Sequence, residues 1–156
     1  MKQKRLAAHL LAAAMLLSAC GVASGGKHLA VYRAVAAPYR NGGELAVAEN
    51  LFLSPGVGII NAAISAFNAE SSDPGLENPL PYGGRILGYE LNGGELRLEA
   101  EGCDELGGFD LTLLCCCAVL TFCAIDGIET VSIISGEKSL CSLLSPGDIM
   151  LTDISA

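Results

Sequence analysis

The segment LTLLCCCAVLTFCAI, residues 111–125, constrains the fold of this chain more than any other stretch. It contains no charged residue, and it lies between Asp110, a suitable helix cap, and Asp126-Gly127, a suitable stop. A long apolar run between such signals predicts a helix that is buried on most sides. The run is too short to cross a bilayer, which takes about 20 apolar residues. We therefore expect residues 110–126 to form the central helix of a protein core.

A second helix and several strands are predicted around this central helix. Ser54 and Pro55 fit the N-cap and the first position of a helix that runs to about Glu70. Its buried face is predicted by the i, i+3, i+4, i+7 spacing of Ile60, Ala63, Ile64 and Phe67. Prolines and glycines indicate a surface loop over 71–84, and β-rich patterns indicate strands over 28–35, 44–53, 85–100 (a hairpin) and 128–135. The fold class is then α+β, a two-layer sandwich of approximate order ββαββαβ with two helices on a small mixed β-sheet.

The register of the hairpin can be predicted from its charges. A turn at Asn92-Gly93 places Glu90 opposite Glu95, whereas a turn at Gly93-Gly94 pairs Glu90 with Arg97. The second register replaces a like-charge pair by an opposite-charge pair, which is worth a few tenths to about 1 kcal/mol. It also pairs Leu91 with Leu96 and Tyr89 with Leu98. We expect this apolar face, with Leu87, Tyr89 and Leu91 on it, to pack on the central helix through Leu113, Leu114 and Leu120.

The first residues of the chain predict export. Lys2, Lys4 and Arg5 precede an apolar stretch of signal-peptide length, which is too short for a comfortable membrane anchor. The sequence Leu17-Ser18-Ala19-Cys20 then resembles the lipobox of bacterial lipoproteins, in which the cysteine receives acyl chains, such as palmitate, and the chain is cut before it. This resemblance implies a signal peptide over 1–19, a lipidated tether over 20–27 and a single domain over 28–156. It places the domain on the extracytoplasmic face of the cell membrane, anchored through Cys20.

The charge of the mature chain excludes one large class of partners. Loss of residues 1–19 leaves six basic residues (nine less three) against seventeen acidic ones, a formal charge of −11. Such a domain is repelled by nucleic acid. It can still be held at a membrane, because acyl chains supply affinity whatever the charge of the domain. The partners expected are the membrane, through Cys20, and proteins, including further copies of the chain.

The cysteines are expected to pack rather than to react. Successive helical residues point about 100° apart, so Cys115, Cys116 and Cys117 cannot converge on one metal. Cys116 and Cys123 are about 10.5 Å apart along a helix, beyond disulfide reach. The chain has no CxxC motif, so neither a metal, nor a cofactor, nor a catalytic site is predicted. Unpaired thiols in an exported chain indicate burial or an anaerobic organism. Cys103 and Cys141, outside the helix, are the candidates for a disulfide, and the sequence leaves open whether they meet.

Three segments together resemble a known family. They are AISAFNAESSDPGLENPLP (63–81), RILGYELNGGELRLEAE (85–101) and FDLTLLCCCAVLTFCAIDGIETVSIISGEK (109–138). They are similar to the helix, loop, hairpin, apolar helix and strand of the GerM domain, found in sporulation and spore-germination lipoproteins of Gram-positive bacteria. The resemblance spans roughly residues 28–150. The chain departs from the family where cysteines replace a valine-tyrosine-threonine-leucine run, with Thr121 in the threonine's place, and where Asp73-Pro74-Gly75 replaces a Gly-Pro.

This resemblance implies a fold like that of ring-building modules, which associate side by side outside the membrane, and it brings no catalytic residues. We therefore expect a lipid-anchored binding or scaffold module of the cell envelope, in sporulation or germination, in a Gram-positive anaerobe. One alternative is an accessory lipoprotein of the cell wall unrelated to sporulation. Another, which the sequence supports less, is an envelope enzyme that depends on its cysteines.

Overall fold

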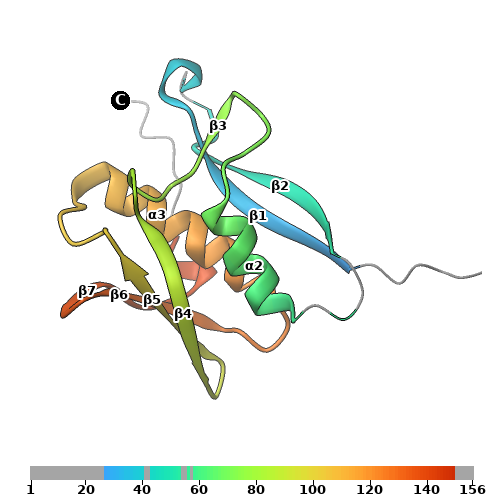
Figure 1. Cartoon of the computed structure of the whole chain (residues 1–156), viewed down its shortest axis with the longest axis vertical. Coiled ribbons are helices and arrows are strands. Elements are labelled where there is room, and N and C mark those ends of the chain that lie inside the picture. Colours follow the sequence, from blue (N-terminus) through green and yellow to red (C-terminus); the bar gives the residue numbers. More distant parts are fainter. Residues whose placement is uncertain (1–26, 41–42, 54–55, 57, 150–156) are drawn as a thin grey trace, which may run out of the picture.

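The computed structural model describes residues 27–40, 43–53, 56 and 58–149, and two β-sheets with two α-helices make up this part of the chain (Figure 1). Sheet A has the strand order β2-β1-β3, and sheet B has the order β4-β5-β6-β7. The strands are β1 (Lys27–Val35), β2 (Ala46–Leu53), β3 (Leu76–Glu77), β4 (Arg85–Asn92), β5 (Glu95–Glu101), β6 (Thr130–Ser135) and β7 (Lys138–Leu144). The helices are α2 (Ile59–Asn68) and α3 (Gly108–Phe122), with short 3-10 turns η1 (Ala37–Tyr39) and η2 (Pro146–Asp148).

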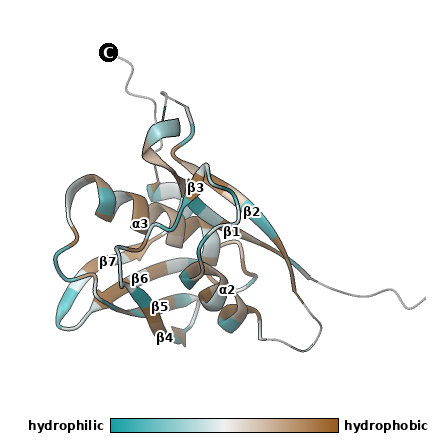
Figure 2. Ribbon diagram, turned by 45° about the horizontal axis from the view of Figure 1, so that its top comes forward, coloured by the Kyte–Doolittle hydropathy of each residue, from teal (hydrophilic) through white to brown (hydrophobic). Residues whose placement is uncertain are grey.

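Helix α3 is the centre of the fold, as its uncharged sequence predicts. It contacts β1 and β2 of sheet A and β6 and β7 of sheet B, so it lies between the two sheets. Figure 2 shows hydrophobic residues along α3 and in the strands on which it packs. Helix α2 packs against β1, β4 and α3. The largest buried apolar side chains come from both helices and from β1, β5 and β6: Val31, Phe67, Leu96, Leu98, Leu114, Val119, Phe122, Val131 and Ile133.

The predicted α+β class is confirmed, but the strands are divided differently. The β-structure forms two sheets because α3, which is apolar on most sides, needs a partner surface on each side. Sheet A is antiparallel, whereas β5 and β6 of sheet B run parallel and are joined by a crossover through α3. Strands β3 and β7 were not predicted. The first is only two residues long within the proline-rich loop, and the second has no regular alternation of apolar and polar residues.

The ends of both helices differ from the sequence-based expectation. Helix α3 begins at Gly108 after the cap residue Gly107, so Asp110 lies in its first turn rather than at the N-cap. It ends at Phe122, and Cys123 is the C-cap. Helix α2 begins at Ile59; the predicted start at Ser54-Pro55 lies outside the described residues. Its Ala63, Ile64 and Phe67 are buried as predicted, and Ile60 is partly buried.

The C-terminal end of α2 is tied to sheet B by one side chain. Asn68 Nδ2 donates a hydrogen bond to the carbonyl of Ile86 at 2.8 Å, and Asn68 Oδ1 accepts one from the Ile86 amide at 2.8 Å. The amide group of Asn68 thus occupies both backbone groups of Ile86 that face away from β5. The helix ends where this contact holds it against strand β4.

The hairpin has the predicted register. Leu91 pairs with Leu96, Tyr89 with Leu98 and Glu90 with Arg97. Gly93 and Gly94 form the turn with φ values of 57° and 97°, a conformation that glycine adopts without a steric cost. The predicted packing of Leu87, Tyr89 and Leu91 on the central helix is wrong, because all three side chains are exposed. A register shift between Ile86 and Gly88 places Ile86 in the core opposite Ala100 and leaves Leu87 exposed.

Candidate functional site

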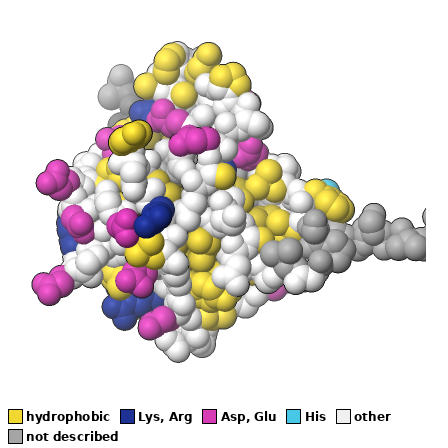
Figure 3. Space-filling model, viewed as in Figure 1, with side chains coloured by type: hydrophobic (Ala, Val, Ile, Leu, Met, Phe, Trp, Pro, Cys, Tyr) yellow, Lys and Arg dark blue, Asp and Glu magenta, His cyan; other side chains and the backbone are white. Residues whose placement is uncertain are grey.

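The outer edge of strand β4 carries the main group of exposed apolar side chains on the hairpin. Leu87, Tyr89 and Leu91 are 49%, 38% and 46% exposed, although their neighbours Leu96 and Leu98 on β5 are fully buried. Helix α3 packs on β6 and β7 of this sheet and helix α2 contacts β4, which leaves the apolar side chains of the edge strand partly uncovered. Figure 3 shows hydrophobic side chains along the lower part of β4 and beside α2. We call Leu87, Tyr89 and Leu91 the β4 edge.

The backbone of β4 is open as well beyond Ile86, whose outward groups bond to Asn68. Strand β4 is the first strand of sheet B and pairs only with β5 among the described residues. An edge strand presents unpaired N–H and C=O groups to which another strand can add. Lysines, prolines and a short length commonly protect such edges. Strand β4 (Arg85–Asn92) has eight residues with neither lysine nor proline, so its sequence does not block pairing.

The other face of the hairpin is charged and hollowed. Gly88 has no side chain, and a Cβ built on it would meet nothing within 4 Å. A hollow of about 410 Å³ lies there, lined by Glu90, Arg97, Glu99 and Ile134 among others. The charges here are of mixed sign, because Glu90 lies opposite Arg97 in the hairpin. Tyr89 and Leu91, which pair with the buried Leu98 and Leu96, thus lie on the core side of β4, whereas the bulge sets Leu87 apart from them. The outside of the strand is polar, as expected of a strand with one face built for contact.

Cys20 and the other lipobox residues, Leu17, Ser18 and Ala19, lie outside the described residues. The six described cysteines are free thiols: Cys103, Cys115, Cys116, Cys117, Cys123 and Cys141. Within the described ranges, no three His, Cys, Asp or Glu side chains gather closely enough to hold a metal ion. The same part of the chain has no helix of the length and hydropathy needed to span a membrane.

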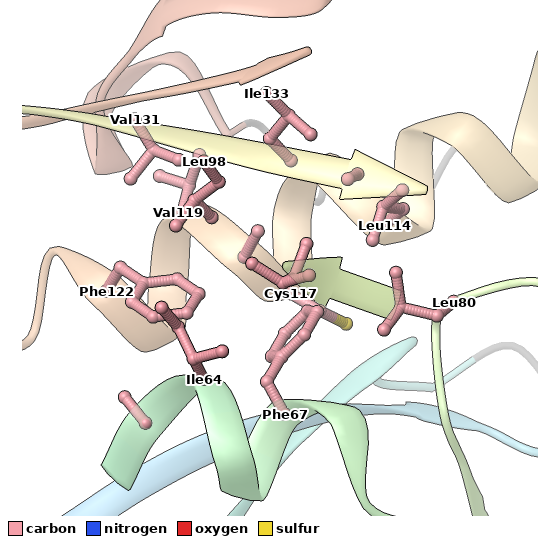
Figure 4. Close-up of a cluster of buried hydrophobic side chains, with 14 of the residues drawn as sticks. Ile64, Phe67, Leu80, Leu98, Leu114, Cys117, Val119, Phe122, Val131 and Ile133 are labelled. Atoms are coloured by element: carbon pink, nitrogen blue, oxygen red, sulfur yellow. The ribbon is translucent and has the colours of Figure 1, made fainter. Parts of the chain in front are cut away.

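The three adjacent cysteines of α3 point in different directions, as their helical spacing predicts. Cys117 is fully buried and lies in the cluster with Phe67 and Leu80 (Figure 4). Burial raises the pKa of the Cys117 thiol to about 12. Cys115 lies about 200° away around the helix and meets strand β7 instead. Burial likewise raises the pKa of the Cys116 thiol. These thiols are protonated at neutral pH and pack as small apolar groups.

Sequence reasoning missed one pair of thiols. Cys115 of α3 and Cys141 of β7 line the same hollow, where the two elements contact one another. The interaction between the two thiols, with burial, raises the pKa of Cys115, and the same interaction lowers the pKa of Cys141 against the effect of burial. Cys103 does not pair with Cys141; its thiol donates to the carbonyl of Glu101 at 3.5 Å. The contact could not be found from sequence because strand β7 was not predicted.

One buried ion pair supports the scaffold. Arg33 of β1 is 1% exposed and donates from Nε to Glu49 Oε2 at 3.0 Å. Its other nitrogens donate to the carbonyls of Ala66 and Phe67, which end helix α2. Desolvation opposes ionisation of Glu49, but the hydrogen bond and the charge of Arg33 outweigh it and lower the pKa of this carboxyl. The pair positions α2 on sheet A and has no open cavity beside it among those the structure describes.

Comparisons with known proteins agree with this architecture. No family model matches the chain, and no curated protein matches its sequence. Among solved structures, the tandem GerMN domains of the sporulation protein GerM from Bacillus subtilis align with 79% of this chain at 17% identity and a TM-score of 0.54. The chain spans only 44% of that structure's length. A candidate lipoprotein from Clostridium perfringens aligns with 73% of this chain and 77% of its own at 12% identity and a TM-score of 0.41. The described part of the chain has a GerM-like fold.

Proposed function

We propose that this chain is a lipid-anchored, extracytoplasmic binding module of the bacterial cell envelope, and that it associates with a second copy of itself through the β4 edge. The observation that carries the proposal is an open, apolar edge strand in a GerM-like fold. An edge strand with open backbone groups and three exposed apolar side chains can pair with a strand of a partner, which would cover these side chains. A role in sporulation or germination follows from the likeness to a sporulation protein.

A second GerM-like domain is the partner that the comparison supports. In the matched structure GerMN domains occur in tandem, so one domain of this fold is followed in the chain by another domain of the same fold. The described part of this chain holds one such unit. An acyl anchor on Cys20 supports the pairing further. Chains that are confined to one membrane surface have a high effective concentration, so even a weak edge contact leads to association.

Photo-crosslinking in intact cells tests this proposal on the full chain. A benzophenone amino acid at position 91 lies on the β4 edge, and the same amino acid at Tyr82, which is fully exposed in a loop, is the matched control. We expect a product of twice the mass of the chain from position 91 and not from position 82, because the benzophenone reacts only with what lies against it. Mass spectrometry of the product identifies the partner.

Two outcomes have opposite meanings. A product that contains only peptides of this chain supports self-association. A product with a different protein, or no product beyond the level at position 82, contradicts it. Lysine at an edge strand prevents pairing, so Leu91→Lys should abolish a crosslink from a benzophenone placed at position 89. Phe52→Lys, at an equally exposed site on β2, should leave that crosslink unchanged.

A further inference from the structure

The side chains of Cys115 and Cys141 share one cavity. Both line a hollow of about 430 Å³ between α3 and β7, together with Leu111, Cys116, Asp148 and Ile149. Cys115 is buried and Cys141 is half-buried. A small reagent in the hollow therefore has readier access to Cys141 than to Cys115.

We propose that Cys115 and Cys141 form a disulfide bond when the chain meets a small-molecule disulfide, which joins helix α3 to strand β7. A disulfide requires two side chains that approach one another with their Cβ atoms about 4 Å apart. Cys115 and Cys141 lie on packed elements and line one hollow, so rotation of their side chains can bring the two sulfurs together. Of the other described cysteines, Cys116 also lines the hollow, whereas Cys117 packs beside Phe67 (Figure 4) and Cys103 donates to a carbonyl.

The reaction follows ordinary thiol–disulfide exchange. The Cys141 thiolate attacks one sulfur of the small disulfide, which forms a mixed disulfide at Cys141 and releases a thiolate that takes up a proton. Cys115 then gives up its proton, and its thiolate attacks Cys141 Sγ and releases the second small thiol. The two cysteines lose two electrons and two protons in total, and the small disulfide gains them as two thiols. Cys141 is suited to the first attack, because it is the more exposed of the two thiols and the neighbouring Cys115 lowers its pKa.

The charge beside the hollow selects among small disulfides. Asp148 contributes a carboxylate, which accepts hydrogen bonds from the backbone and hydroxyl of Ser145 and keeps its charge. Cystamine carries an ammonium group at each end and is attracted by this carboxylate, whereas oxidised glutathione is anionic and is repelled. Cystamine should therefore react several times faster than oxidised glutathione. This difference should shrink at high salt, because Asp148 is exposed.

Peptide mapping of the full chain tests the proposal. The chain is purified from membranes in non-ionic detergent, reduced, freed of reductant and treated with cystamine; remaining thiols are then alkylated. Trypsin cuts after Arg97 and Lys138, so Cys115 and Cys141 fall in different peptides, 98–138 and 139–156. We expect one linked species of the two peptides that separates on reduction, and fragment ions that place the bond at Cys115.

Two variants sharpen the result. Cys141→Ala should lose the linked species, whereas Cys103→Ala should keep it. A disulfide between Cys141 and Cys103, Cys116 or Cys117 overturns the proposal. A stable mixed disulfide at Cys141 without a linked peptide also overturns it, and so does the absence of any reaction. The fragment ions come from the unaltered chain, so the assignment does not depend on whether a variant folds. Circular dichroism before treatment verifies that the unaltered chain is folded.

Discussion

The backbone amide of Tyr32 in β1 donates a hydrogen bond of 2.8 Å to Oγ1 of Thr121 in α3, 89 residues along the chain. Strand β3 pairs only with Ala34 and Val35 of β1, so this side of Tyr32 has no strand partner in the described structure. Thr121 is fully buried in an otherwise apolar part of the helix. A single hydroxyl thus takes the place of a missing strand and joins sheet A to the central helix.

We predict that Thr121→Val destabilises the protein by about 1–3 kcal/mol, because it leaves the Tyr32 amide buried without an acceptor. Valine has nearly the shape of threonine, so lost packing does not explain such a loss. Thr121→Ser is the matched control: it keeps the hydroxyl and loses a methyl group. Urea unfolding followed by circular dichroism measures both variants. Equal stability of Thr121→Val and the unaltered chain would contradict the role of this hydrogen bond.

Local patterns predicted most of the fold. The uncharged run in α3, the apolar spacing in α2 and the charge pairing of the hairpin each depend on residues near one another in sequence. Periodicity and turn chemistry describe such short-range relationships well. The GerM-like class followed from the order of these elements. The lipobox at Cys20 stays a prediction, because it lies outside the described residues.

The features that sequence reasoning missed depend on long-range geometry. The exposure of Leu87 follows from a bulge that a regular hairpin pattern does not contain, and that of Leu91 follows from the position of β4 at the edge of sheet B. The Cys115–Cys141 contact requires strand β7, whose pattern is weak. In each case the contact joins segments that are distant in sequence, so the pattern of neighbouring residues does not indicate it. The side chains of the β4 edge were therefore predicted to lie in the core.

The burial of individual leucines predicts how much each contributes to stability. Leu114 is fully buried, whereas Leu120 is only partly buried. Leu114→Ala should cost about 2–5 kcal/mol, since it removes a large side chain from a close-packed core. Leu120→Ala should cost clearly less, because part of its surface is already in water. Cys116→Ala is a smaller change and should be tolerated. Thermal unfolding measures all three variants, and a larger loss for Leu120 than for Leu114 would contradict this arrangement of the core.

The ion pair of Arg33 and Glu49 predicts a dependence of stability on pH. The pKa of Glu49 is lowered from 4.5 in the folded chain. A carboxyl with a lowered folded pKa contributes stability above its unfolded pKa, and that contribution is lost as the pH falls through the folded pKa. Glu49→Gln should therefore be less stable than the unaltered chain at pH 6, and the difference should shrink below about pH 4. Glu99→Gln, on the exposed face of β5, is the control and should show a much smaller effect.

Anchoring through Cys20 gives a direct prediction. Cys20→Ser should leave an uncleaved chain without acyl groups, because the thiol is the group that is alkylated in proteins with this motif. The unaltered chain should partition into the detergent phase of a Triton X-114 extract, and mass spectrometry should find acyl chains on its first residue. Ser18→Ala keeps a small residue in the motif and should be processed normally. Unaltered chain found only in the culture medium, cut elsewhere than before Cys20, would contradict the anchor.

Salt should strengthen the contact at the β4 edge. The formal charge is −8 for the full sequence and −11 without residues 1–19, so in either form two copies repel one another at long range. The screening length falls from about 30 Å at 0.01 M salt to about 8 Å at 0.15 M, while burial of Tyr89 and Leu91 is little affected. Crosslinking from position 91 on neutral lipid vesicles should therefore increase between these two conditions. An association driven by pairs of opposite charge would decrease instead, and that result would exclude the apolar edge as the main contact.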